Sequence, residues 1–162
     1  MTDTKTLSPT WKLVISIFIC EFVGTAAGFF TRTEISGWFF TLNKPSWNPP
    51  PYLFAPIWIS LYFLMGCALW LVWKSEWSQP QKRNAMVLFF LQLFLNFCWS
   101  ILFFKFHSPA LALADILLLI VAIIATMFAF APISRTASWL MVPYISWVVF
   151  ASILNYSIWT LN

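Results

Sequence analysis

Polar side chains recur at helical spacing inside long apolar segments of this sequence. Gln92, Asn96 and Ser100 follow one another at intervals of four residues, so on a helix they share one face. A polar group in such a segment costs free energy unless it has a partner. One interpretation is hydrogen bonding between helices, which contributes about 0.6 kcal/mol per pair. The other is a cavity that presents these groups to a ligand.

Similar stripes with aromatic and small residues occur in this segment and in two others. In chain order the stripes are Trp58 and Tyr62, then Asn96 and Trp99, then Trp147, Ala151 and Asn155. The sequence has eleven tryptophans, and those at segment ends fit the aromatic belt of a membrane protein. Trp99 and Trp147 lie well inside their segments, where packing or ligand contact explains them better. Together with the carboxylates of Glu21 and Asp115, the stripes suit a cavity for a large, flat, mostly apolar ligand with polar edges.

Motifs for several other chemistries are missing from the sequence. It contains no GxxxxGK[ST], GxGxxG or HExxH pattern, so nucleotide-binding and zinc-hydrolase functions have no support. The one histidine, His107, lies beside Lys105 in a predicted turn. It could ligate a haem iron, but a loop histidine at a membrane surface is far more often solvated. We predict no metal site and no resident cofactor. The scattered basic residues form no patch for nucleic acid.

Transmembrane helices are the elements that must position these residues. Only 9% of the residues are charged, compared with about 25% in soluble proteins. Four long stretches contain no charged residue, and a helix needs about 20 residues to cross a hydrocarbon core of about 30 Å. The runs lack the alternation of barrel strands. We therefore predict an all-α protein with a single domain, residues 1–162, in which five transmembrane helices span roughly 12–30, 54–73, 84–105, 108–131 and 136–159.

Basic residues are distributed unequally between the two predicted sides of the membrane. Lys and Arg accumulate in short cytoplasmic loops. One side carries three basic residues and the other six: Arg32, Lys44 and Lys105, against Lys5, Lys12, Lys74, Lys82, Arg83 and Arg135. This imbalance predicts a cytoplasmic N-terminus and an external C-terminus. We expect a multi-pass protein in a bacterial cell membrane.

The first connection between spans, from Thr31 to about Leu53, is long and rich in aromatic residues and proline. It contains Trp38-Phe39-Phe40 and Lys44-Pro45-Ser46-Trp47-Asn48-Pro49-Pro50-Pro51. The prolines cannot continue a helix and favour a stiff extended chain. We expect this connection to form a lid over the helix ends, with Trp38 and Trp47 among its aromatic residues.

Gly24 and Gly28 form a GxxxG pattern in the first predicted span. Such a pattern lets two helix backbones approach closely. It indicates either a homodimer surface or packing within one chain. If it is a dimer surface, leucine at either position is expected to weaken self-association.

Several motifs follow one another along nearly the whole chain. They are Trp38-x3-Leu42-x-Lys44-Pro45-Ser46-Trp47-Asn48-Pro49-Pro50, Pro56-x-Trp58, Leu61-Tyr62-x-Leu64-Met65-Gly66, Gln92-Leu93-x-Leu95-Asn96-x2-Trp99-Ser100-x2-Phe103-Phe104 and Pro143-Tyr144-x2-Trp147-x2-Phe150-Ala151-x2-Leu154-Asn155. This set resembles the translocator protein family. Its bacterial members are called tryptophan-rich sensory proteins, and its animal members peripheral benzodiazepine receptors.

The resemblance implies a function and a set of ligand-facing residues. It implies five helices, a pocket closed by the first loop, binding of porphyrins, other tetrapyrroles and aromatic drug-like molecules, and often a homodimer. By position, the residues facing the ligand would be Phe39, Pro49, Trp58, Tyr62, Asn96, Trp99, Ser100, Asp115, Trp147 and Ala151. Some members are reported to degrade protoporphyrin oxidatively in light, which would place Trp58 and Trp147 against the ring. Ligand binding by a receptor, sensor or transporter, porphyrin degradation dependent on light and oxygen, and a scaffold for partner membrane proteins all stay open.

The end of the last predicted span departs from the animal pattern. Animal members bind cholesterol through a Leu/Val-Tyr-Lys/Arg pattern there. In this sequence Leu154-Asn155-Tyr156-Ser157-Ile158-Trp159 is followed by no Lys or Arg. The difference argues against sterol as a ligand.

Overall fold

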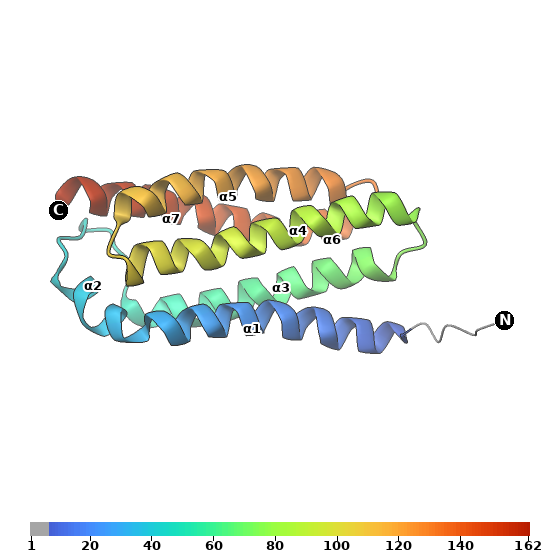
Figure 1. Ribbon diagram of the computed structural model, residues 1–162, viewed down its shortest axis with the longest axis horizontal. Coiled ribbons are helices and arrows are strands. Elements are labelled where there is room, and N and C mark those ends of the chain that lie inside the picture. Colours follow the sequence, from blue (N-terminus) through green and yellow to red (C-terminus); the bar gives the residue numbers. More distant parts are fainter. Residues whose placement is uncertain (1–6) are drawn as a thin grey trace.

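The computed structural model describes residues 7–162, and Lys5, which contributed to the predicted orientation, lies outside this range. Within the range, five helical segments are long and apolar enough to cross a membrane: Pro9–Ser36, Pro51–Lys74, Gln79–Lys105, Pro109–Phe130 and Arg135–Leu161. Figure 1 shows them side by side in one elongated bundle. The predicted fold, an all-helical bundle of five spans, is confirmed.

Several of the helices begin at a capping serine or a proline, and others begin at neither. In chain order they are α1 Pro9–Ser36, α2 Trp38–Thr41, η1 Pro51–Leu53, α3 Phe54–Lys74, α4 Gln79–Ser100, η2 Ile101–Lys105, α5 Pro109–Phe130, α6 Arg135–Leu140 and α7 Val142–Leu161. The side chains of Ser8, Ser108 and Ser134 each accept a hydrogen bond from a backbone N–H in the first turn of the helix that follows. Proline lies in the first turn of several helices, where its missing N–H has no partner to lose.

The first span is longer than predicted. The expected helix over 12–30 extends to Ser36, because Arg32 and Glu34 continue the helix beyond the apolar run, and it ends before Gly37. The connection expected from Thr31 to Leu53 therefore starts at Gly37. It contains a short helix, α2, and ends in the single 3₁₀ turn of η1.

The third and fifth spans also differ from their predicted limits. Helix α4 starts at Gln79, earlier than the predicted residue 84, since polar residues can continue a helix outside the lipid. It then runs into the π-helical turn η2, which ends at Lys105 as predicted. The fifth span is divided at Met141 into α6 and α7, because Pro143 has no N–H to offer the preceding turn.

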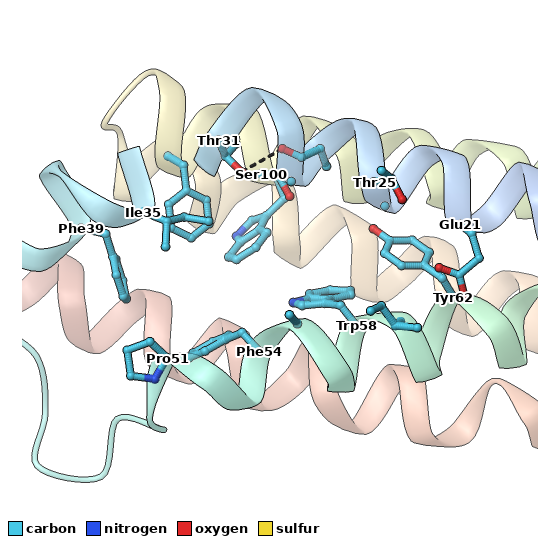
Figure 2. Close-up of a pocket in the computed structure, with 17 residues that line it drawn as sticks. Glu21, Thr25, Thr31, Ile35, Phe39, Pro51, Phe54, Trp58, Tyr62 and Ser100 are labelled. Carbon is cyan, nitrogen blue, oxygen red and sulfur yellow. Dashed lines mark hydrogen bonds between the residues drawn. The ribbon is translucent and has the colours of Figure 1, made fainter. Parts of the chain in front are cut away.

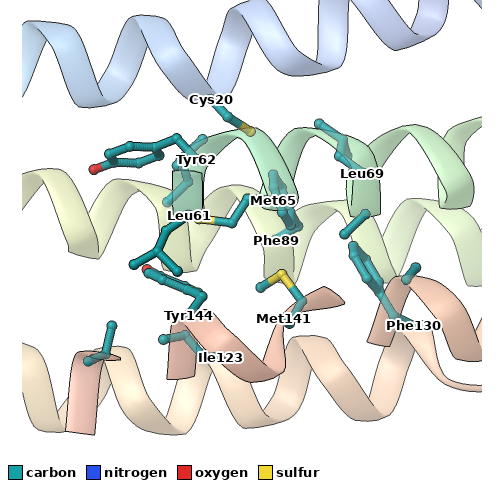
Figure 3. Packing of buried hydrophobic residues seen from close by; sticks show 14 of the residues in the cluster. Cys20, Leu61, Tyr62, Met65, Leu69, Phe89, Ile123, Phe130, Met141 and Tyr144 are labelled. Carbon is teal, nitrogen blue, oxygen red and sulfur yellow. The ribbon is translucent and has the colours of Figure 1, made fainter. Parts of the chain in front are cut away.

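Side chains from all five spans fill the centre of the bundle. Helix α1 packs on α3, α4 on α5, and α5 on α7. Figure 3 shows Met65 of α3, Phe89 of α4 and Tyr144 of α7 among the buried residues. The rings of Phe89 and Phe130 stack with centroids 5.8 Å apart. Helices α3 and α4, which contribute to this buried core, also supply residues that line the candidate site.

The predicted lid, here the connection of residues 37–53, is attached to the end of the bundle that contains the C-terminus. Asn43 donates its backbone N–H to the side-chain oxygen of Asn162 at 2.9 Å, and the Asn162 amide donates to the Asn43 carbonyl at 3.0 Å. The first described residues lie at the opposite end (Figure 1). Which end faces the cytoplasm stays a prediction.

Candidate functional site

A cavity of about 490 Å³ lies between α1 and α3. Its back wall is formed by the junction of α4 and η2, and α2 and η1 close it at the lid end, as Figure 2 shows. Its volume lies within the range of about 300–1,000 Å³ that is typical of small-molecule sites. Figure 2 draws its seventeen lining residues.

Six of the seventeen lining residues are aromatic. Phe54, Trp58 and Tyr62 follow one another at intervals of four along α3, so their rings share one face of that helix. The Trp58 and Tyr62 rings lie 5.6 Å apart at 30°. Trp99 and Phe104 line the cavity from α4 and η2, with ring centroids 6.1 Å apart. The cavity therefore offers flat, polarisable surfaces to a ligand.

Few polar groups line this cavity, and some of them already form hydrogen bonds within the protein. Thr31 donates its hydroxyl to the carbonyl of Ala27 at 2.8 Å, a bond drawn in Figure 2. Trp99 donates its indole N–H to Asn155 at 3.1 Å. The Glu21 carboxylate, by contrast, forms no ion pair within residues 7–162. A ligand would therefore meet mostly apolar surface and one acidic group.

A hydrogen-bonded chain of three side chains lies behind the cavity wall. The Tyr62 hydroxyl donates to the Asn96 side-chain oxygen, and the Asn96 amide donates to the Tyr144 hydroxyl at 3.1 Å. Asn96 is 1% exposed and does not line the cavity. This arrangement favours the interpretation of Asn96 as a link between α3, α4 and α7.

We expect Asn96→Leu to lower the stability of the bundle by about 1–3 kcal/mol, because it leaves two buried tyrosine hydroxyls without their partner. Gln92 is a matched control on the same helix face. It is fully buried, and neither of its side-chain polar atoms has a hydrogen-bond partner among the described residues. Gln92→Leu should therefore leave the thermal unfolding midpoint in detergent unchanged or raised. An equal drop of the unfolding midpoint in the two variants would contradict this role for Asn96.

A second hollow, of about 30 Å³, lies behind Trp58. Trp147 and Ala151 of α7 line it, together with Phe39, Trp58 and Trp99. It holds little more than one water molecule. Since Trp58 borders both hollows, its ring stands between the main cavity and α7.

The structure places the ten predicted ligand residues in three groups. Five line the main cavity: Phe39, Trp58, Tyr62, Trp99 and Ser100. Trp147 and Ala151 line only the small hollow, whereas Pro49, Asn96 and Asp115 line neither. Pro49 lies in the lid, where its carbonyl accepts a hydrogen bond from the Asn48 amide. Asp115 is buried on α5, and its Oδ2 has no hydrogen-bond partner among residues 7–162.

Helix α1 supplies the part of the site that sequence reasoning mostly missed. Glu21, expected as a cavity carboxylate, lines the cavity. The other lining residues of α1 were not assigned to a cavity: Gly24, Thr25, Ala27, Gly28, Thr31 and Ile35. Most of them recur at intervals of three or four, and this spacing of small and polar residues was a usable signal. Both glycines of the GxxxG pattern lie on this wall, within one chain, and the homodimer stays a prediction.

The lid helix α2 is held by an aromatic and charged cluster at the end of the bundle. The Trp38 ring stacks on the His107 ring with centroids 4.3 Å apart and an interplanar angle of 16°. The His107 Nε2 lies 3.0 Å from a Glu34 carboxylate oxygen, and the Lys105 ammonium lies 3.7 Å from the other oxygen. This cluster fixes α2, and with it Phe39, over the cavity. The second lid residue, Trp47, is 46% exposed and contacts Phe150 at 5.8 Å between ring centroids.

We expect His107→Ala to loosen α2, because the substitution removes both the face on which Trp38 stacks and a partner of Glu34. An aromatic stack contributes about 0.5–1.5 kcal/mol, so amide hydrogen exchange in α2 should accelerate about three- to tenfold. Lys105→Ala is the control, since an exposed pair at the longer distance contributes little. Unchanged exchange in the His107 variant would show that other contacts hold the lid.

Comparisons with known proteins extend over nearly the whole chain. The profile of the TspO/MBR family matches residues 16–160. A tryptophan-rich protein TspO of Chlorobaculum tepidum is 47% identical over 93% of this chain and 95% of its own length. The translocator protein of Homo sapiens is 34% identical over 96% and 94%. A tryptophan-rich sensory protein of Cereibacter sphaeroides is 38% identical over 77% of each chain.

Proposed function

This chain belongs to the TspO/MBR family, and we propose that it is a receptor, sensor or transporter that binds porphyrins and other tetrapyrroles in the cavity between α1 and α3. The membrane setting follows from its five apolar helices and its relatives. Two of the relatives bear the names sensory protein and translocator protein. The ligand class is our inference for this chain.

The observation that supports this proposal is an aromatic cavity of about 490 Å³ with few polar groups. A tetrapyrrole is flat and mostly apolar, with polar groups on its edge. Trp58, Tyr62 and Trp99 offer it ring faces, and stacking on such faces contributes about 0.5–1.5 kcal/mol beyond burial. The lid, anchored through Trp38, would cover the ligand after entry. A homodimer in the membrane is part of the same proposal.

The direct test is a titration of the purified protein with protoporphyrin IX in the dark. Saturable binding, followed by the porphyrin absorbance and by tryptophan quenching, would support the proposal. Binding that rises without saturation, as in empty detergent micelles, would contradict it. The same samples are then illuminated in the presence of oxygen. Turnover to one defined product would favour the alternative function of porphyrin degradation, whereas recovery of unchanged porphyrin would favour binding alone.

A further inference from the structure

Glu21 is the one charged side chain among the seventeen residues that line the cavity. It lies in the middle of α1, well inside the span Pro9–Ser36. A carboxylate at membrane depth is expensive and usually faces a polar partner or a cavity. Since Glu21 has no ion pair within residues 7–162, the helix packing gives no reason for its presence.

Glu21 lies at one end of the cavity, and the indole N–H of Trp58 points toward the other. Figure 2 shows Glu21 beside Tyr62, at the end far from Phe39, Pro51 and the lid. The Trp58 ring lies between these ends, with its indole N–H edge toward the lid. The cavity therefore has a hydrogen-bond acceptor at its inner end and a donor on the lid side.

A basic side chain adds to this polarity at the lid. The Lys44 ammonium lies 4.7 Å from the centroid of the Phe39 ring, whose side chain closes the cavity. It also donates to the carbonyl of Leu42 at 3.0 Å, which holds it in place. An anionic group that leaves the cavity past Phe39 would approach this cation, whereas an anionic group at the inner end would meet the Glu21 carboxylate.

We propose, on the basis of the function proposed above, that Glu21 selects the charge pattern and the orientation of the ligand. The preferred ligand carries its carboxylates on one edge, which faces the lid. Its opposite edge carries no carboxylate and lies against Glu21. A flat ring with carboxylates on all sides places one of them beside Glu21 in every orientation and is disfavoured.

The test compares porphyrins that differ in charge at similar size. Protoporphyrin IX carries its two carboxylates on one edge, whereas coproporphyrin carries four, distributed around the ring. Coproporphyrin tetramethyl ester has nearly the same shape as coproporphyrin without the charge. In the wild-type protein we expect coproporphyrin to bind at least about tenfold more weakly than its ester, because two like charges a few ångströms apart repel strongly in a medium of low polarity.

The substitution Glu21→Gln removes the charge and keeps the shape of the side chain. It should raise coproporphyrin affinity about tenfold and leave the affinity for the ester unchanged, which also shows that the variant is folded. Glu76→Gln, which removes a carboxylate from an exposed position in the α3–α4 connection, should change neither affinity.

Two negative results have different meanings. If the wild-type protein fails to bind protoporphyrin IX, the proposed function is overturned, and the inference with it. If protoporphyrin IX binds but the ratio of acid to ester affinity is the same in the wild-type and Glu21→Gln proteins, only the role of Glu21 is overturned.

Discussion

Replacing Trp58 by alanine is expected to lower the affinity for protoporphyrin IX by roughly thirtyfold, or about 2 kcal/mol, as for a central aromatic residue of a binding site. Trp58 borders both the main cavity and the small hollow behind it. Its removal deletes a large flat contact surface and joins the two spaces. Absorbance of the porphyrin is the suitable readout, because the substitution also removes a tryptophan whose fluorescence a bound porphyrin would quench.

Two further variants separate ring contact from general damage. Trp58→Phe keeps an aromatic face at this position and should lose only a few-fold in affinity. Trp147→Ala changes a residue that lines only the small hollow and packs against Phe54 and Phe150. Trp147→Ala should therefore lower the porphyrin affinity less than Trp58→Ala does. If Trp147→Ala lowers the porphyrin affinity as much as Trp58→Ala does, the ligand lies deeper, against α7. Equal porphyrin affinity in all variants would show that the ligand does not bind in this cavity.

The fold could be predicted from the sequence because membrane crossing imposes a simple requirement. Long stretches without charge have one stable solution in lipid, a helix that satisfies its own backbone. The same reasoning could not place the helix ends. Outside the lipid, polar residues such as Arg32 and Glu34 can continue a helix, so α1 extends to Ser36. The break at Met141 depends on one proline inside an otherwise apolar run.

The site was predictable where one helix alone decides the geometry. The helical period alone places Trp58 and Tyr62 on one face of their helix, and both residues line the cavity. The role of Asn96 depends instead on how α3, α4 and α7 are rotated about their axes. A small rotation decides whether the Asn96 side chain faces a ligand or forms its hydrogen bond to Tyr144. No local pattern contains this information. For the same reason Trp147, assigned to the ligand by position, lies behind Trp58.

The two glycines of α1 should respond very differently to substitution. A Cβ atom on Gly24 would lie 2.3 Å from a ring carbon of Tyr62, far inside van der Waals contact. A Cβ atom on Gly28 would meet no atom of the described chain within 4 Å. Gly24→Ala is therefore expected to destabilise the protein by about 1–3 kcal/mol through overpacking. The displaced Tyr62 ring would also lose its hydrogen bond to Asn96. Gly28→Ala should unfold at the wild-type temperature.

Leucine at the same positions distinguishes a cavity wall from a dimer surface. Gly28→Leu places a branched side chain in open space on the cavity wall, so it should block porphyrin binding at least about tenfold while the unfolding midpoint changes little. Gly24→Leu should lose stability and binding together. Thermal unfolding, porphyrin titration and the dimer fraction in detergent are measured on each variant. If both leucine variants instead lose only self-association and keep the porphyrin affinity, the GxxxG face is a contact between two copies of the chain, and the cavity along α1 is not where the ligand binds.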